Sequence, residues 1–374
     1  MIIGVPKETK VHEYRVGLTP FSVRELTAHG HEVLVETGAG AAIDFSDADY
    51  RGAGAKIVAS ADEVFAGADM IVKVKEPLEA DRRRLQENQV LFTYLHLAPD
   101  PVQAKDLLAS RAICIAYETV TSSAGTLPLL APMSEVAGRM SIQAGATALE
   151  KSHGGRGVLL PGVPGVAPGK VVIIGGGVVG VNAAQMAVGL GADVMVLDRS
   201  IDVLRRIDAR FGATVKTVYS TRAAIEAAAL EADLVIGAVL VPGAAAPKLI
   251  DRKLLARMKR GAVLVDVAID QGGCFETSRP TTHDKPTYEV DGIVHYCVAN
   301  MPGAVARTST LALNNATLPF VLALAEKGWK RALRDDAHFG DGLNIAAGKV
   351  TNRAVAEALG LPYTPVDNAM REAA

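Results

Sequence analysis

The stretch VVIIGGGVVGVNAAQMAVGLGADVMVLDRS, residues 171–200, limits the possible folds of this chain more than any other. Gly175, Gly177 and Gly180 form a G-x-G-x-x-G pattern between a β-branched run and an apolar helical run. In such a pattern the first glycine permits a tight turn, the second lets a pyrophosphate approach the backbone, and the third lets the helix pack closely on the strand. The first turn of the helix supplies free N–H groups and the positive end of the helix dipole. The pattern therefore predicts a strand–turn–helix unit that binds a dinucleotide.

The residue after the next apolar run identifies the dinucleotide more closely. Asp198 follows the run VMVL, where a carboxylate accepts hydrogen bonds from the adenosine ribose hydroxyls. The same negative charge repels a 2′-phosphate, so the sequence favours NAD over NADP. Arg199 comes next and would soften this preference.

Short apolar runs alternate with amphipathic runs along most of the chain, which is typical of parallel strands joined by helices. Strands are expected at residues 2–5, 33–36, 70–75, 90–94, 112–117, 171–174, 194–197, 234–236, 263–267 and 294–298. Helices are expected at residues 20–29, 47–54, 62–66, 101–110, 179–190, 201–211, 221–230 and 248–259. Thr19 and Asp100 each precede a proline and are the expected N-caps of two of these helices.

The order of these elements predicts two Rossmann-like, doubly wound parallel-sheet domains with a cleft between them. The Gly- and Pro-rich residues 154–169 precede the second series of strands and are expected to form an ordered loop. Residues 308–374 contain two further helical patterns, which we expect to fold back on the first domain. The predicted domains are residues 1–128 with 308–374, a discontinuous substrate domain, and residues 129–307, which bind the dinucleotide.

Composition excludes several classes of function. A net charge of −2 provides no basic field for nucleic acid. The three cysteines are far apart and indicate a reducing compartment and no disulfide framework. The sequence shows no signal peptide, and the uncharged residues 171–192 read as strand, turn and helix rather than as a membrane span. We therefore expect a cytoplasmic protein with no membrane partner.

In parallel sheets, ligands lie beyond the carboxyl ends of the strands. The residues that follow the later strands of the second series are Val239, Leu240, Ala268, Ile269, Asp270, Asn300 and Met301. Among them Asp270 is the notable residue, because a carboxylate there would face the nicotinamide end of a dinucleotide.

Four charged or titratable residues follow strands of the first series, and each has two interpretations. His96 is either a core histidine bonded to a backbone carbonyl or a proton-transfer group. Lys73 and Lys75 alternate with valines, so either both lie on a solvated edge or one of them is functional. Arg15 is a surface arginine or a carboxylate-binding fork. Because Arg15, Lys75 and His96 follow strands of one sheet, they would suit a small anionic substrate together.

Motifs spread over essentially the whole chain resemble those of the alanine dehydrogenases. They are IGVPKETKVHEYRVGLTP, VKVKEP, TYLHLA, PLLAPMSEVAGRM, IIGGGVVG, DVAIDQGG and NMPGAVARTST. Proton-translocating nicotinamide nucleotide transhydrogenases share the fold and the N-terminal motif. The combination of the Lys-Glu-Pro motif with His96 and Asp270 fits the dehydrogenases better.

The resemblance implies roles for individual residues. His96 and Asp270 would be the catalytic pair, and Arg15 and Lys75 would bind the substrate carboxylate and carbonyl. The cofactor would contact Ser134, Gly175, Gly177, Val178, Val179, Gly180, Asp198, Ser220, Val239, Leu240, Val267, Ala268, Ile269, Asp270, Val298, Ala299, Asn300 and Met301. Some relatives carry a basic residue where Val203 stands, and that residue contacts the cofactor near its adenosine end. Some relatives also resemble metal binders that use a glutamate like Glu118 and a histidine in the C-terminal helices. LALAEKGWKRAL offers no such histidine, so no metal site is predicted.

The resemblance also implies an activity and an assembly. The reaction would be the reversible, NAD-dependent oxidative deamination of L-alanine to pyruvate and ammonium, catalysed by a homohexamer. Two other functions stay open: the NAD(H)-binding component of a transhydrogenase, and a protein that senses NADH without turnover. The transhydrogenase component needs no amino-acid site, so it would leave the set of Arg15, Lys75 and His96 unexplained.

Overall fold

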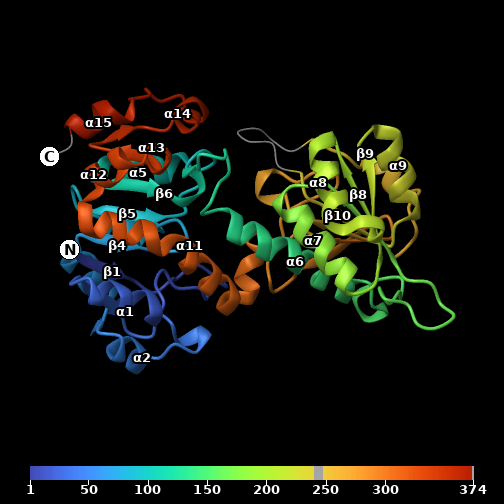
Figure 1. The fold of residues 1–374 in the computed structure, drawn as a ribbon, viewed down its shortest axis with the longest axis horizontal. Helices are drawn as coiled ribbons and strands as arrows, with labels where there is room; N and C mark the ends of the chain where they lie inside the picture. The colour runs from blue at the N-terminus through green and yellow to red at the C-terminus, as the bar shows by residue number, and fades with distance from the viewer. Residues whose placement is uncertain (240–246, 373–374) are drawn as a thin grey trace. The chain divides into compact units, whose positions relative to one another are not determined.

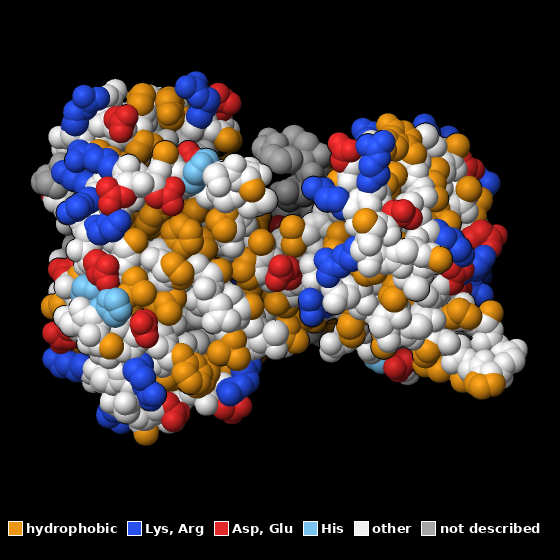
Figure 2. Space-filling model, in the orientation of Figure 1, with side chains coloured by type: hydrophobic (Ala, Val, Ile, Leu, Met, Phe, Trp, Pro, Cys, Tyr) orange, Lys and Arg blue, Asp and Glu red, His pale blue; other side chains and the backbone are white. Residues whose placement is uncertain are grey.

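The computed structural model describes residues 1–239 and 247–372. The chain forms two compact units. Unit 1 contains residues 1–133 and 305–374, and unit 2 contains residues 134–304. Both chain termini belong to unit 1 (Figure 1). On the face that Figure 2 shows, Lys and Arg side chains of both units are interspersed with Asp and Glu, as expected for a net charge near zero.

Unit 1 is built on an eight-stranded sheet with the order β15-β14-β6-β5-β4-β1-β2-β3. Its six parallel strands are β1 (Ile2–Val5), β2 (Glu32–Glu36), β3 (Lys56–Val58), β4 (Met70–Val72), β5 (Val90–Thr93) and β6 (Ile113–Ala116). β14 (Leu343–Ala346) and β15 (Lys349–Val350) add an antiparallel edge. The strand order reverses between β1 and β4, which creates a crevice at their carboxyl ends.

The helices of unit 1 come from both ends of the chain. They are α1 (Pro20–Ala28), α2 (Asp47–Gly52), α3 (Ala61–Gly67), α4 (Glu79–Arg84), α5 (Pro101–Ser110), α11 (Ala306–Lys327), α12 (Trp329–Asp335), α13 (Ala337–Gly340), α14 (Arg353–Leu359) and α15 (Val366–Glu372). Thr19 and Asp100 cap α1 and α5 as predicted. The C-terminal elements belong to unit 1, and β14 pairs with β6.

Residues Met301–Lys327, which include α11, are long and apolar enough to cross a membrane by length and composition. In the structure, however, α11 packs against α1, and four of its polar side chains, Ser309, Thr310, Asn314 and Thr317, are buried. Asn314 Oδ1 accepts hydrogen bonds from Thr19 N at 2.8 Å and from Ser22 Oγ at 2.8 Å. These contacts are those of a core helix of unit 1.

Unit 2 has a seven-stranded sheet with the order β12-β13-β11-β10-β7-β8-β9. Its strands are β7 (Lys170–Ile174), β8 (Asp193–Asp198), β9 (Val215–Tyr219), β10 (Leu234–Gly237), β11 (Val263–Asp266), β12 (Thr287–Val290) and β13 (Ile293–Tyr296). Its helices are α6 (Ala131–Ala148, which begins in unit 1), α7 (Val178–Gly189), α8 (Ile201–Phe211), α9 (Arg222–Glu231) and α10 (Arg252–Leu255). The six parallel strands follow the Rossmann order, reversing between β7 and β10.

Two expected elements are much shorter in the structure. The strand predicted over 70–75 ends at Val72, so Lys73 and Lys75 lie in the segment after β4 and not together on one face of a strand. The helix predicted over 248–259 is limited to Arg252–Leu255. It starts late because residues 249–250 run alongside residues 274–275, where Leu249 N donates to the Cys274 carbonyl, and the Asp251 side chain then caps the helix.

Candidate functional site

In unit 1, the segments that follow β4 and β5 are joined by direct hydrogen bonds. Tyr94 N donates to the Val74 carbonyl at 3.3 Å, and Thr93 Oγ1 donates to the Lys75 carbonyl at 2.9 Å. The Lys75 side chain is 12% exposed, and its ammonium lies 3.6 Å from the Glu76 carboxylate. Lys73 is 1% exposed, which rules out its assignment to a solvated edge. Of the two lysines, Lys75 is therefore the one that a ligand can reach.

Arg15 is buried and held by a neighbouring carboxylate. Its Nε and Nη2 donate to the two oxygens of Glu13 at 2.7 and 2.6 Å, and Nη1 lies 3.1 Å from Met133 Sδ. Burial by itself lowers the pKa of Arg15, but the hydrogen bonds and charge of Glu13 outweigh it and raise the pKa. Arg15 is therefore a permanently charged, rigidly held group and not a surface arginine.

His96 has an unusual backbone conformation, with a φ of +50°. Its N–H donates to Glu118 Oε1 at 2.6 Å, and Leu95 N donates to both Glu118 oxygens at 3.2 Å. The imidazole stacks on the Tyr94 ring with centroids 5.8 Å apart, and the side chain is 45% exposed. The structure therefore excludes the buried core histidine and presents an accessible imidazole on a fixed backbone.

The glycine turn of unit 2 fits a dinucleotide pyrophosphate. Gly175 has a φ of +104°, and a Cβ at Gly180 would lie 1.8 Å from the Gly175 carbonyl oxygen. Gly177 is the N-cap of α7, and a Cβ there would meet no atom within 4 Å. The turn is thus closed on the protein side and open beside the helix N-terminus, as a bound phosphate requires. Val178 and Val179 begin α7 beside this space.

Asp198 ends β8 and points its carboxylate at the same turn. Its oxygens accept hydrogen bonds from Gly176 N and Ser200 N, both at 2.7 Å. Ser220 follows β9, and its N–H donates to the Asp198 carbonyl at 2.9 Å. Asp198 and Ser220 therefore lie together at the carboxyl end of the sheet. Val203, on α8, packs close to Gly176.

The remaining predicted cofactor residues follow β10, β11 and β13, apart from Ser134 on α6. Val239, Val267, Ala268, Ala299, Asn300 and Ser134 are half-buried, Asp270 is exposed, and the side chains of Ile269, Val298 and Met301 are buried. A ligand would reach Ile269, Val298 and Met301 through the backbone. Leu240 lies outside the described residues.

Models of the "Alanine dehydrogenase/PNT" family match both parts of this chain. The N-terminal domain model matches residues 4–137, and the C-terminal domain model matches residues 141–353. The chain belongs to the alanine dehydrogenase/PNT family.

Several relatives match this family member over nearly their full length. The alanine dehydrogenase of Halomonas elongata is 64% identical over 97% of this chain and 98% of its own, and that of Bacillus subtilis is 56% identical over 100% and 98%. A solved L-alanine dehydrogenase has a TM-score of 0.93 at 54% identity, covering 96% of this chain and 99% of its own. A Sinorhizobium meliloti transhydrogenase has a TM-score of 0.81 at 24% identity, covering 95% and 100%, which shows a shared fold.

In this alanine dehydrogenase/PNT family member, three acidic residues make main-chain contacts that the sequence did not predict. Glu8 and Glu118 accept main-chain N–H groups of the segments that carry Lys75 and His96. Asp266, fully buried at the end of β11, accepts hydrogen bonds from Ala268 N at 3.1 Å and Cys274 N at 2.8 Å. The sequence feature that could have identified these residues is an acidic residue close to the end of an apolar strand.

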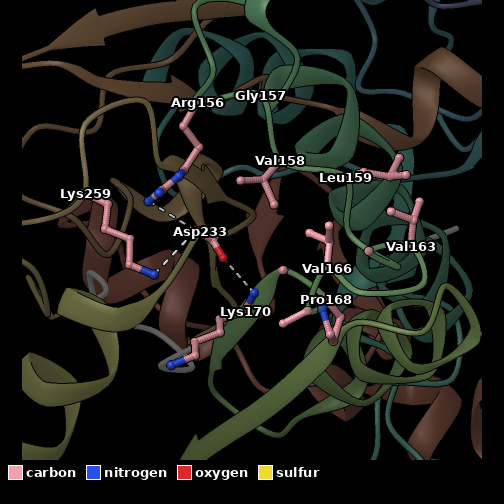
Figure 3. A pocket seen from close by; sticks show the side chains of 13 residues that line it. Arg156, Gly157, Val158, Leu159, Val163, Val166, Pro168, Lys170, Asp233 and Lys259 are labelled. Carbon is pink, nitrogen blue, oxygen red and sulfur yellow. Dashed lines mark hydrogen bonds and ion pairs between the residues drawn. The ribbon is translucent and has the colours of Figure 1, made fainter.

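A pocket of about 440 Å³ lies away from these residues, at the amino ends of β7 and β10 (Figure 3). Asp233 is its centre and contacts Lys170 N at 2.8 Å, Arg156 Nη1 at 3.2 Å and Lys259 Nζ at 3.5 Å. Ligands of such sheets bind at the carboxyl ends of the strands. This pocket is therefore not the dinucleotide site, and Asp233 instead ties the loop before β7 to the sheet.

Proposed function

We propose that this protein is an L-alanine dehydrogenase that converts L-alanine, NAD⁺ and water reversibly to pyruvate, ammonium and NADH. The observation that carries the proposal is 54–64% identity to proteins named alanine dehydrogenase over almost the entire chain. The buried Arg15, the reachable Lys75 and the exposed imidazole of His96 support it, because they match a small amino acid that carries a carboxylate.

Unit 2 would hold NAD by its glycine turn. The space beside Gly177 would accept the pyrophosphate at the N-terminus of α7, and the Asp198 carboxylate would bind the adenosine ribose. When held there, NAD⁺ would supply the acceptor for the hydride of the alanine Cα. Asp198 supports NAD over NADP, since its negative charge disfavours a 2′-phosphate.

Arg15 and Lys75 would bind the substrate. Glu13 fixes the guanidinium of Arg15, so this group meets the substrate carboxylate as a preorganised cation. Lys75 places an ammonium near the carbonyl oxygen of pyruvate and polarises it, which favours attack of ammonia in the reductive direction.

His96 and Asp270 would transfer the protons that the reaction requires. The ammonium of alanine first gives up a proton, and loss of the hydride from Cα then produces an iminium. Water adds to the iminium carbon and loses a proton, and the carbinolamine releases ammonia as its nitrogen gains a proton and its hydroxyl loses one. An imidazole and a carboxylate are suited to accept and return these protons. A His96→Ala change is expected to lower kcat by about 10²–10⁴-fold, and full turnover by this variant would remove His96 from the mechanism.

The deciding experiment measures NADH formation from L-alanine and NAD⁺ at alkaline pH, together with NADH consumption by pyruvate and ammonium. Turnover in both directions is expected. Tight NADH binding without turnover of any small amino acid would overturn the proposal and favour a transhydrogenase component or an NADH sensor.

We also propose that the enzyme is a cytoplasmic homohexamer that takes part in alanine catabolism and holds no metal. The hexamer rests on the family resemblance, and the location rests on three buried free thiols. In the described residues, no group of three or more His, Cys, Asp or Glu side chains could hold a metal ion. Light scattering of the purified protein tests the hexamer, and activity after chelator treatment tests the metal.

A further inference from the structure

We propose that Glu8 is a positioning residue that places Lys75 for substrate binding. This role rests on the proposed function, in which Lys75 binds the substrate. Glu8 lies after β1, far from Lys75 in sequence, and its two carboxylate oxygens do different work. Oε1 accepts hydrogen bonds from Val74 N at 2.7 Å and Lys75 N at 3.2 Å, while Oε2 accepts one from Lys73 Nζ at 3.0 Å.

A buried carboxylate of this kind requires a positive partner, and Lys73 supplies it. Glu8 is 7% exposed and Lys73 is 1% exposed. Burial lowers the pKa of Lys73, but the nearby charges of Glu8 and Asp81 outweigh it and raise the pKa. Lys73 therefore supplies the positive charge that balances the Glu8 carboxylate. Asp81 lies 3.3 Å from Lys73 Nζ and also 3.7 Å from Arg84 Nη1.

The other main-chain groups of residues 73–75 are bonded to the strands on the far side. The carbonyl oxygens of Lys73 and Lys75 accept the hydroxyls of Tyr117 at 3.0 Å and Thr93 at 2.9 Å. The N–H groups of Val74 and Lys75 are directed the other way, to Glu8. Glu8 thus provides the bonds that fix this segment to the β1 side of the crevice.

Lys75 depends on this backbone because its own side chain is weakly held. Among the described residues, its ammonium makes one ion pair, with Glu76 at 3.6 Å, which is longer than a hydrogen bond. The position of Nζ therefore follows from the position of the Lys75 backbone. A displacement of about 1 Å in a substrate-positioning group can cost about 10²-fold in rate.

Two double variants separate the acceptor role of Glu8 from its charge. Glu8→Gln/Lys73→Met removes both charges and keeps a carbonyl oxygen for the N–H groups of Val74 and Lys75. Glu8→Leu/Lys73→Met removes the same charges and also the acceptor. Because both variants lose the ion pair, a difference between them reports the main-chain hydrogen bonds alone.

The readout is kcat and KM for pyruvate, each normalised to NADH sites counted by fluorescence titration of the same preparation. Glu8→Gln/Lys73→Met is expected to stay within about threefold of the parent, because both N–H groups keep an acceptor. Glu8→Leu/Lys73→Met is expected to raise KM and lower kcat/KM by about 10- to 10²-fold, with NADH affinity unchanged. The fall in kcat/KM of Lys75→Ala gives the upper limit of the loss that a displaced Lys75 can cause.

Equal kcat/KM in the two double variants would overturn the positioning role. If Glu8→Leu/Lys73→Met does not fold, Glu8→Asp decides, since it keeps the charge for Lys73 but withdraws the carboxylate from the two N–H groups. An unchanged KM in Glu8→Asp would then also overturn the role. No turnover by the parent would instead overturn the proposed function itself, and full turnover by Lys75→Ala would overturn the substrate-binding role of Lys75 on which the role of Glu8 rests.

Discussion

The two units have the same order of parallel strands but treat the crevice at the point of reversal differently. In unit 2 the crevice lies between β7 and β10. There β7 leads into α7 through the glycine segment 175–177, which leaves open space at Gly177. In unit 1 the crevice lies between β1 and β4. There β1 leads into α1 through the longer segment 6–19, and Glu8 and Lys73 occupy the crevice as a buried ion pair.

This difference shows that strand order creates a crevice without deciding what fills it. Backbone without side chains leaves room for a pyrophosphate, whereas a carboxylate and an ammonium close the same position and anchor the next loop. Unit 1 is therefore a Rossmann-like sheet in which the protein's own side chains fill the crevice where unit 2 has space for a nucleotide. Changes at the two crevices should accordingly affect different ligands.

The largest effect is expected from Gly180→Ala. The new Cβ would lie 1.8 Å from the Gly175 carbonyl oxygen, so α7 must move away from the turn at a cost of about 3 kcal/mol or more. We expect NADH binding to be lost in a fluorescence titration.

Gly17→Ala is the matched change in unit 1, where a Cβ would lie 2.3 Å from the Val72 carbonyl oxygen. We expect this variant to keep its affinity for NADH while its KM for pyruvate rises. Loss of NADH binding in Gly17→Ala would contradict the separate use of the two crevices.

A smaller effect is expected from Asp198→Ala. The carboxylate would lose its hydrogen bonds to Gly176 N and Ser200 N as well as to the ribose. Hydrogen bonds to charged groups contribute about 1.5–3 kcal/mol, so KM for NAD⁺ should rise roughly 10- to 100-fold, and the NAD-to-NADP preference should fall. Asp202→Ala, which removes an exposed carboxylate on α8, is the control. An unchanged preference would show that Asp198 does not face the ribose.

Gly177→Ala should sharpen the comparison further. A Cβ at Gly177 meets no protein atom, so the melting temperature should stay close to that of the parent while NADH affinity falls about tenfold, or about 1.4 kcal/mol. Gly189→Ala, at the other end of α7, also meets no atom and should instead stabilise the protein by about 0.5–1 kcal/mol. If Gly177→Ala bound NADH like the parent, the pyrophosphate would not lie at this turn.

The smallest effect concerns the cysteine thiols, which can report on each unit separately. Burial raises the pKa of Cys114 in unit 1 to about 12, and burial followed by the charge of Asp266 raises that of Cys274 in unit 2. We expect no thiol to react with Ellman's reagent in the native protein, because the thiolate is the reactive form.

With saturating NADH, the unit 2 thiols should become exposed at a higher urea concentration. This shift should be larger than the shift for Cys114. A ligand present at 100 times its Kd stabilises by about 2.7 kcal/mol. Cys114→Ala, which leaves only Cys274 and Cys297, allows the two signals to be assigned. A thiol that reacts within seconds in the native protein would contradict the burial described here.

The sequence predicted the alternation of strands and helices and the glycine turn because these depend on local periodicity and spacing. It was wrong about residues 70–75, where a regular Val-Lys alternation leaves the sheet after Val72. The cause is Glu8, whose carboxylate competes for the N–H groups that a longer β4 would offer. Such a contact joins residues that are distant in sequence, so no local pattern contains it.

The candidate site divides in the same way. His96 could be identified as a residue of interest from its place after a strand, but its positive φ and its exposure depend on Glu118, which follows a different strand. Residue type and strand position thus indicate which side chains are candidates. Their orientation depends on acidic partners that the sequence alone does not assign.

The bond between Glu8 and residues 74–75 has a consequence for protein engineering. A designer who transferred the VKVKEP segment to another sheet would move the lysine without the acceptor that holds its backbone. The smallest transferable piece is discontinuous: it needs the strand that ends before Glu8, the strand that ends before Lys73, and the hydroxyls of Thr93 and Tyr117 on the far side. Contacts from four strands fix the position of Lys75, and only the transfer of all four would preserve that position.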